Sequence, residues 1–135
     1  MLPVDVYDRI YAIINTTTVN ALIDGEIVIG KPPLNDIKKW ISIMSSSMDD
    51  DFPQECITSV VIYVPNQDNG MKDATSVNAI SRAVKAELDA YVQTEDKYFQ
   101  FRFGDYGDFP VPENGKYNSF VFRLECYIGN EIVRN

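Results

Sequence analysis

The first fifteen residues carry apolar side chains at helical spacing. Tyr7, Ile10, Tyr11 and Ile14 are separated by three or four positions, which places them on one face of a helix over residues 3–15. A helix with one apolar face needs a partner surface. This segment is therefore expected to pack against a core.

The threonines that follow predict a break and then a second, shorter helix. Thr16 or Thr17 can act as the N-cap, because a threonine hydroxyl accepts a hydrogen bond from a free backbone amide in the first turn. Gly25 stands where this helix is expected to end. The apolar residues of the helix would be Val19, Leu22 and Ile23.

The longest helical pattern lies between residues 77 and 91. Its apolar positions are Val77, Ile80, Val84, Leu88 and Tyr91. Arg82, Lys85 and Asp89 fall on the other side. The pattern predicts an amphipathic helix that faces a core on one side and solvent on the other.

Other segments favour β-strands. They cover residues 26–30, 39–44, 56–64, 98–103 and 120–128. Most alternate between two kinds of side chain, as a strand with one buried face does, although helix is a competing interpretation for 39–44. Residues 56–64 are almost continuously apolar and β-branched, which predicts a strand covered on both faces.

The order of these elements predicts an α+β fold. Helices and strands do not alternate regularly, so we expect a mainly antiparallel sheet of four to five strands with an N-terminal helix and one long helix packed on it. At 135 residues, positions 1–135 are expected to form a single domain. Pro32 and Pro33 follow the short strand at 26–30 and favour an edge position for it.

Two polar connections are the candidate protein-interface loops. Residues 45–55 contain Asp49, Asp50, Asp51 and Phe52. Residues 104–118 are long for a loop in a compact domain, and loops of that length are often functional. The residues singled out in this second loop are Asp105, Tyr106, Asp108 and Phe109. Aromatic side chains are enriched in protein interfaces, although they can equally fold back onto their own core.

The sequence contains no histidine. The commonest general base, the histidine-dependent nucleophile pairs and imidazole metal ligands are thereby absent. No glycine-rich phosphate loop occurs either, and the two cysteines, Cys56 and Cys126, are expected as reduced, buried side chains. We therefore predict a protein that is not an enzyme, with no catalytic or metal residues and no cofactor.

Carboxylates leave two chemical alternatives open. Asp49, Asp50 and Asp51 could hold a hard cation, but they lack the spacing of a calcium loop. Asp105 and Asp108, together with Glu113, could act as an acid and base pair in glycoside chemistry. With 20 acidic residues in the chain, chance proximity explains both groups as well.

The net charge of −8 argues against tight binding to nucleic acid, which depends on clustered lysine and arginine. No apolar run approaches the ~20 residues that cross a bilayer, so we expect no membrane association. The N-terminal residues do not read as a signal peptide, since Asp5 and Asp8 interrupt them. An intracellular origin is expected.

Residues 21–28, followed by Lys31, Pro32 and Pro33, resemble the early segment of the tail-completion, or tail-terminator, proteins of bacteriophages. In those proteins an N-terminal helix leads through a turn and a strand to a loop with proline. The similarity continues through residues 61–64 and the turn at Gly70 into the long helix. It then runs to the last strands, with Phe122, Leu124, Cys126 and Tyr127.

This resemblance implies a structural subunit of a phage or prophage. Such subunits form a closed ring, commonly a hexamer, where the tail tube meets the head side, and they stop tube growth and offer a docking surface. The implied partners are further copies, tail-tube proteins and head-connector proteins in the neck or tail of the virion, assembled in the bacterial cytoplasm. A head-completion protein, a neck adaptor, a carboxylate-dependent hydrolase and an acidic binding module remain as alternatives.

Overall fold

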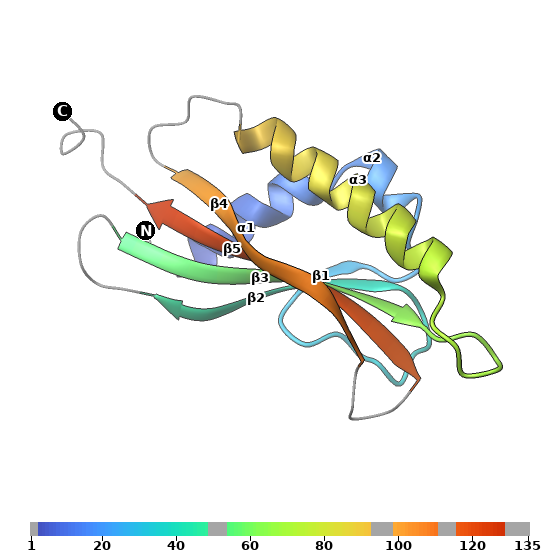
Figure 1. The fold of residues 1–135 in the computed structure, drawn as a ribbon. Coiled ribbons are helices and arrows are strands. Elements are labelled where there is room, and N and C mark those ends of the chain that lie inside the picture. The colour runs from blue at the N-terminus through green and yellow to red at the C-terminus, as the bar shows by residue number, and fades with distance from the viewer. Residues whose placement is uncertain (1–2, 49–53, 93–98, 111–115, 129–135) are drawn as a thin grey trace.

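The computed structural model describes residues 3–48, 54–92, 99–110 and 116–128, which form one five-stranded sheet with helices on one face (Figure 1). The helices are α1 (Pro3–Ile14), α2 (Thr17–Asn20) and α3 (Ala74–Val92). The strands are β1 (Ile27–Ile29), β2 (Trp40–Met48), β3 (Gln54–Pro65), β4 (Phe99–Pro110) and β5 (Tyr117–Ile128).

The strand order is β1-β2-β3-β5-β4. β1 runs parallel to β2, while the pairs β2–β3, β3–β5 and β4–β5 are antiparallel. The predicted α+β class is confirmed, and β1 alone makes the sheet mixed. The expected edge strand at residues 26–30 is confirmed as well, since β1 is one outermost strand and β4 is the other.

The core lies between the sheet and the helices α1 and α3 (Figure 1). On the helix-facing side of the central strands, Ile43, Val60 and Phe122 are at most 1% exposed. They meet the apolar faces that the sequence predicted. The fully or almost fully buried residues of these faces are Ile10 and Ile14 on α1 and Val77, Ile80, Val84 and Leu88 on α3. Burial of this kind contributes about 1.5–3 kcal/mol for each large aliphatic side chain.

The prediction that residues 56–64 are covered on both faces was wrong in part. Thr58, Val60 and Ile62 face the helices and are fully buried. On the opposite face, Val61 is 6% exposed and therefore buried, whereas Ser59 and Tyr63 are only half-buried. The helices cover one side of the sheet, and the other side is covered only in part.

The two predicted loops are shorter than the sequence suggested. Residues 45–48 continue β2, and residues 54–55 already belong to β3. Residues 104–110 continue β4, and residues 117–118 begin β5. A register shift between Phe103 and Tyr106 accommodates the glycine-rich and acidic residues there as a bulge. Pro110 fits the end of an outermost strand, where one backbone edge needs no partner.

Gly25 has a different role from the one predicted. α2 ends at Asn20, and its N-cap is Thr16, whose hydroxyl accepts a hydrogen bond from the Val19 amide at 3.3 Å. Gly25 lies against the backbone just before β2. A Cβ atom at Gly25 would stand 2.7 Å from the Lys39 carbonyl oxygen and 2.7 Å from the Trp40 ring. Only glycine allows this close approach.

The start of α3 is fixed by Asp73. Its carboxylate accepts hydrogen bonds from the Ser76 hydroxyl at 2.8 Å and from the Ser76 amide at 3.2 Å. These bonds lower the pKa of the Asp73 carboxyl below its ordinary value. The arrangement satisfies an amide that the first turn of the helix leaves free.

Gly25→Ala is expected to reduce the free energy of unfolding by about 1–3 kcal/mol, because the added methyl group collides with the Lys39 carbonyl and the Trp40 ring. Urea unfolding followed by circular dichroism measures the change. Gly104→Ala is the matched control, since the nearest atom to its Cβ would lie at 3.4 Å. Equal stability of Gly25→Ala and the native chain would contradict the close packing.

Asp73→Ala is expected to lower the free energy of unfolding by about 1 kcal/mol at neutral pH. Because the pKa of Asp73 is lower in the folded state, its contribution is complete above the unfolded pKa of about 3.9. It is lost as pH falls through the folded pKa, so the two proteins should converge in acid. Denaturation across pH tests this. Asp89→Ala, which removes an exposed ion pair with Lys85, should cost less.

Candidate functional site

The structure describes only one of the two predicted sets of interface residues. Asp49, Asp50, Asp51 and Phe52 lie outside the described residues. Asp105, Tyr106, Asp108 and Phe109 lie on β4, which is an outer strand and not a loop. The register sets Tyr106 opposite Phe122, Asp108 opposite Phe120 and Phe109 opposite Ser119.

The strands that flank the two predicted interface regions turn at opposite ends of the sheet. β2 ends beside the start of β3, at the end of the sheet where Gln54 pairs with Ile128. The β4–β5 hairpin closes at the other end, where Pro65 pairs with Tyr117. At about 3.3 Å for each residue, the two ends of β5 are separated by about 36 Å.

The outermost strands are unequal. β1 has three residues and is followed by Gly30, whose φ of +99° favours glycine. The Gly30 carbonyl accepts a hydrogen bond from the Ser42 hydroxyl, and its amide donates to the Ile43 carbonyl at 3.0 Å. β4 has twelve residues. Long edge strands can pair with another chain, so β4 is the larger candidate for strand addition.

The segment between β1 and β2 covers one end of the sheet's outer face. Trp40 and Tyr117 are 5% and 1% exposed there and pack with Val28, Leu34 and Tyr63. The Tyr117 hydroxyl donates to the Asp36 carbonyl at 3.1 Å and accepts from the Lys38 amide at 3.1 Å. The Trp40 indole also donates to the Asp36 carbonyl, at 3.1 Å.

These bonds hold the backbone on both sides of Ile37, whose side chain is 50% exposed. Apolar side chains on exposed segments are ordinary when scattered. Ile37 differs because a buried tyrosine fixes both of its flanking peptide groups. The backbone of Ile37 is thereby held in place, and its side chain is presented to solvent.

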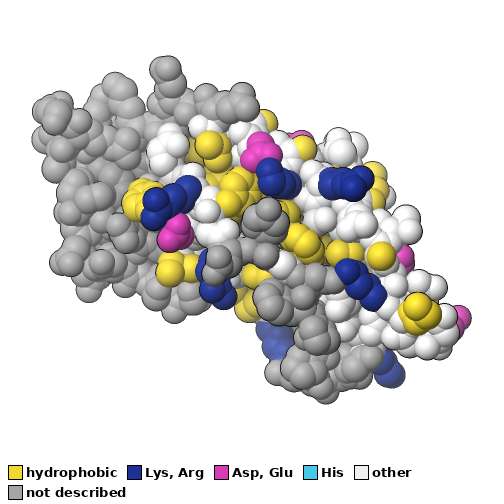
Figure 2. All heavy atoms as spheres, in the orientation of Figure 1, with side chains coloured by type: hydrophobic (Ala, Val, Ile, Leu, Met, Phe, Trp, Pro, Cys, Tyr) yellow, Lys and Arg dark blue, Asp and Glu magenta, His cyan; other side chains and the backbone are white. Residues whose placement is uncertain are grey.

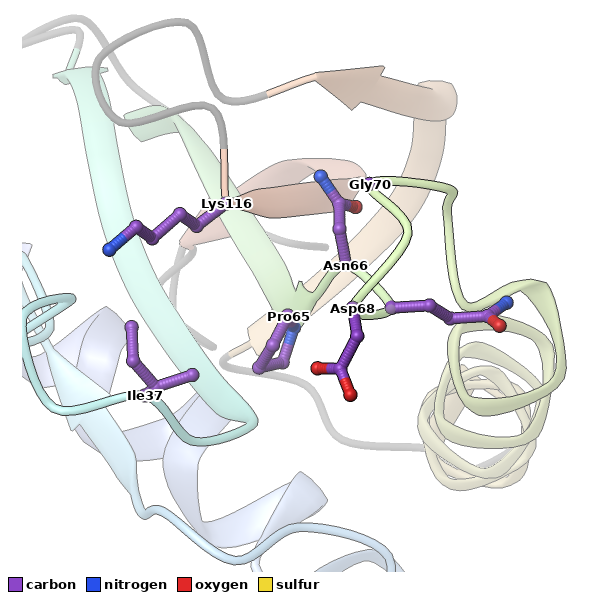
Figure 3. A pocket seen from close by; sticks show the side chains of 7 residues that line it. Ile37, Pro65, Asn66, Asp68, Gly70 and Lys116 are labelled. Carbon is purple, nitrogen blue, oxygen red and sulfur yellow. The ribbon is translucent and has the colours of Figure 1, made fainter.

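Ile37 borders a hollow of about 350 Å³. The remaining lining comes from the end of β3, the following turn and the start of β5, namely Pro65, Asn66, Gln67, Asp68, Gly70 and Lys116 (Figure 3). The Asn66 amide donates to the Lys116 carbonyl at 2.7 Å, and the Gly70 amide to the Gln67 carbonyl at 2.8 Å. Backbone hydrogen bonds within the protein therefore hold the wall of the hollow in place.

The sequence prediction missed this hollow. It identified the turn at Gly70, which is confirmed by the φ of +83° at Gly70. In the same turn the Met71 amide donates to the Asn69 side chain at 3.0 Å. No local pattern links Tyr117 to Lys38, which lie 79 residues apart in the chain. An isoleucine inside a polar segment just before Trp40 was the one available signal.

Charged side chains do not gather into a basic patch on the face shown in Figure 2, where uncharged and hydrophobic side chains separate the lysines and arginines. Arg102 and Glu125 form an ion pair at 2.7 Å on neighbouring strands β4 and β5. Among residues that the structure describes, no three His, Cys, Asp or Glu side chains stand close enough to hold a metal ion. Cys126 is a buried free thiol in the core. The backbone of Cys56 on β3 lies opposite that of Cys126 on β5 in the strand register.

Within the described ranges, none of the helices combines the length and the apolar character that crossing a membrane requires.

Neither a family model nor a curated protein matches the sequence. A solved structure does match the fold. It is a chain of the "Virion of native gene transfer agent (GTA) particle", with a TM-score of 0.58 and 16% sequence identity. The match covers 90% of this chain and 92% of the other.

Tyr117→Phe is expected to release the segment around Ile37, because it removes the hydroxyl that joins Asp36 and Lys38. Loss of the two hydrogen bonds should lower the free energy of unfolding by about 1–3 kcal/mol. Hydrogen exchange should rise at the Lys38 amide in particular. Tyr7→Phe, on the distant helix α1, is the control. An unchanged exchange rate at Lys38 would show that the hydroxyl does not hold the segment.

Proposed function

We propose that this protein is a structural subunit of a phage-like virion. It forms a ring at the head–tail junction, ends growth of the tail tube and provides a docking surface there. The observation that carries the proposal is the similarity in fold over 90% of the chain to a component of a gene transfer agent virion. The resemblance of the sequence to tail-completion proteins supports the more specific position.

The protein acts through contact surfaces and carries out no reaction. The absence of histidine from the sequence supports this, because imidazole supplies the usual proton transfer at neutral pH. Three exposed features can serve as contact surfaces. They are the long outer strand β4, the exposed side chain of Ile37 and the hollow beside it.

A head-to-tail contact suits this subunit. The outermost strands differ in length and in direction relative to their neighbours, so the two edges of the sheet are not equivalent. Contacts between different surfaces generate a ring when the rotation between subunits closes. The net charge of −8 fits a ring through which DNA slides without binding tightly.

The proposal is tested by mass and by electron microscopy. Purified protein, alone and with tail tubes of the same particle, should give rings with a mass several times the subunit mass of 15.3 kDa. The rings should sit at one end of each tube and stop its extension. Tubes that keep growing in the presence of the protein would contradict the assignment as a terminator. Binding to head connectors instead would identify a head-completion protein or neck adaptor.

The hydrolase alternative makes an opposite prediction. We expect Asp105→Asn to leave folding and ring formation unchanged, and magnesium or calcium to leave the melting temperature unchanged. A carboxylate-dependent enzyme would lose its activity in this variant and would gain stability with a divalent ion. Asp8→Asn, on the exposed side of α1, serves as the matched control. Turnover of any substrate that depends on Asp105 would overturn the non-enzymatic function.

A further inference from the structure

The hollow beside Ile37 has the features of a preformed protein-docking site. Binding to a mobile segment costs conformational entropy, which a segment with a fixed backbone has largely lost already. The backbone of Ile37 is fixed because the Tyr117 hydroxyl bonds to the peptide groups of Asp36 and Lys38 on either side of it. Ile37 is nevertheless 50% exposed and so retains apolar area that a partner can cover.

The lining of the hollow specifies the chemistry of its occupant. Figure 3 shows Pro65 between Ile37 on one side and Asp68 on the other, with Lys116 above Ile37. Ile37 and Pro65 provide apolar contact, and a volume of about 350 Å³ admits one or two aliphatic side chains. Asp68 and Lys116 carry opposite charges at the border. A complementary segment therefore holds aliphatic residues with an acidic residue on one side and a basic residue on the other.

The chain itself contains such a segment just after β5. The residues are Glu131, Ile132, Val133 and Arg134. An acidic side chain, two aliphatic side chains and a basic side chain follow one another in the order that the hollow requires. The sequence beyond β5 therefore carries the matching chemistry.

This segment cannot reach the hollow of its own subunit. β5 ends at Ile128, whereas the hollow lies at the other end of the strand, where Tyr117 pairs with Pro65. That distance is about 36 Å along the strand. Ile132 follows Ile128 by four residues, which span at most about 14 Å when fully extended. Only the hollow of another copy is accessible to it.

We propose that residues 131–134 of one copy dock in the hollow of a second copy. Ile132 and Val133 supply the aliphatic contact with Ile37 and Pro65, Glu131 faces Lys116, and Arg134 faces Asp68. The contact joins opposite ends of two sheets, so it is head-to-tail and can close into a ring. It rests on the proposed function in one respect, because the ring supplies the neighbouring copy.

The docking is tested with a peptide of residues 129–135, blocked at both ends, titrated into isotope-labelled full-length protein. Saturable chemical-shift changes are expected at Ile37, at residues 66–70 and at Lys116. Ile37→Asp in the protein should weaken binding at least tenfold, as should a peptide with Ile132→Asp and Val133→Asp. Ile29→Asp is the matched control, because Ile29 is 46% exposed and does not line the hollow.

An exchange of charges tests the orientation. Asp68→Arg in the protein and Arg134→Asp in the peptide should each weaken binding severalfold, and the two together should restore it. Absence of saturable shifts, or equal binding by Ile37→Asp protein of native circular dichroism, would overturn the docking. Failure of the combined exchange to restore binding would overturn the assigned orientation.

Assembly separates this inference from the proposed function. Full-length protein with Ile132→Asp and Val133→Asp should form rings at least tenfold less readily than the Ile29→Asp control. Rings that form equally well with these variants would refute the docking and leave the terminator function standing. Peptide binding in a protein that neither forms rings nor caps tubes would support the docking and refute the function.

Discussion

The antiparallel pairing of β3 with β5 is the constraint on which the other elements depend. It runs from Gln54 opposite Ile128 to Pro65 opposite Tyr117 and occupies the centre of the sheet. The register sends Val60, Ile62 and Phe122 to the same face, where α1 and α3 pack. A slip of one residue would turn all of them to the other face, so the buried core and the register maintain each other.

The same pairing determines the surfaces available for assembly. It brings Tyr117 to the end of the sheet where β3 turns toward α3, and there its hydroxyl holds Asp36 and Lys38. The ring of Tyr117 packs edge-on against Tyr63, with centroids 6.4 Å apart. One aromatic side chain thus links the central strands, the segment before β2 and the hollow. The position of Ile37 is in this way a consequence of the sheet register.

The sequence could predict elements whose signal is local. The apolar faces of α1 and α3, the strands and the turn at Gly70 all follow from the spacing of neighbouring residues. Residues 104–110 were predicted wrongly because their glycine, aspartate and proline content is typical of a loop. Pairing with β5, together with a bulge and an outer position, overrides that local preference. The parallel direction of β1 is likewise set by partners distant in the chain.

The candidate surfaces were less predictable than the fold for the same reason. Aspartates and aromatics drew attention to two connections, yet the register places those connections at opposite ends of the sheet. The hollow depends on three segments that only the fold brings together, and no motif marks it in the sequence.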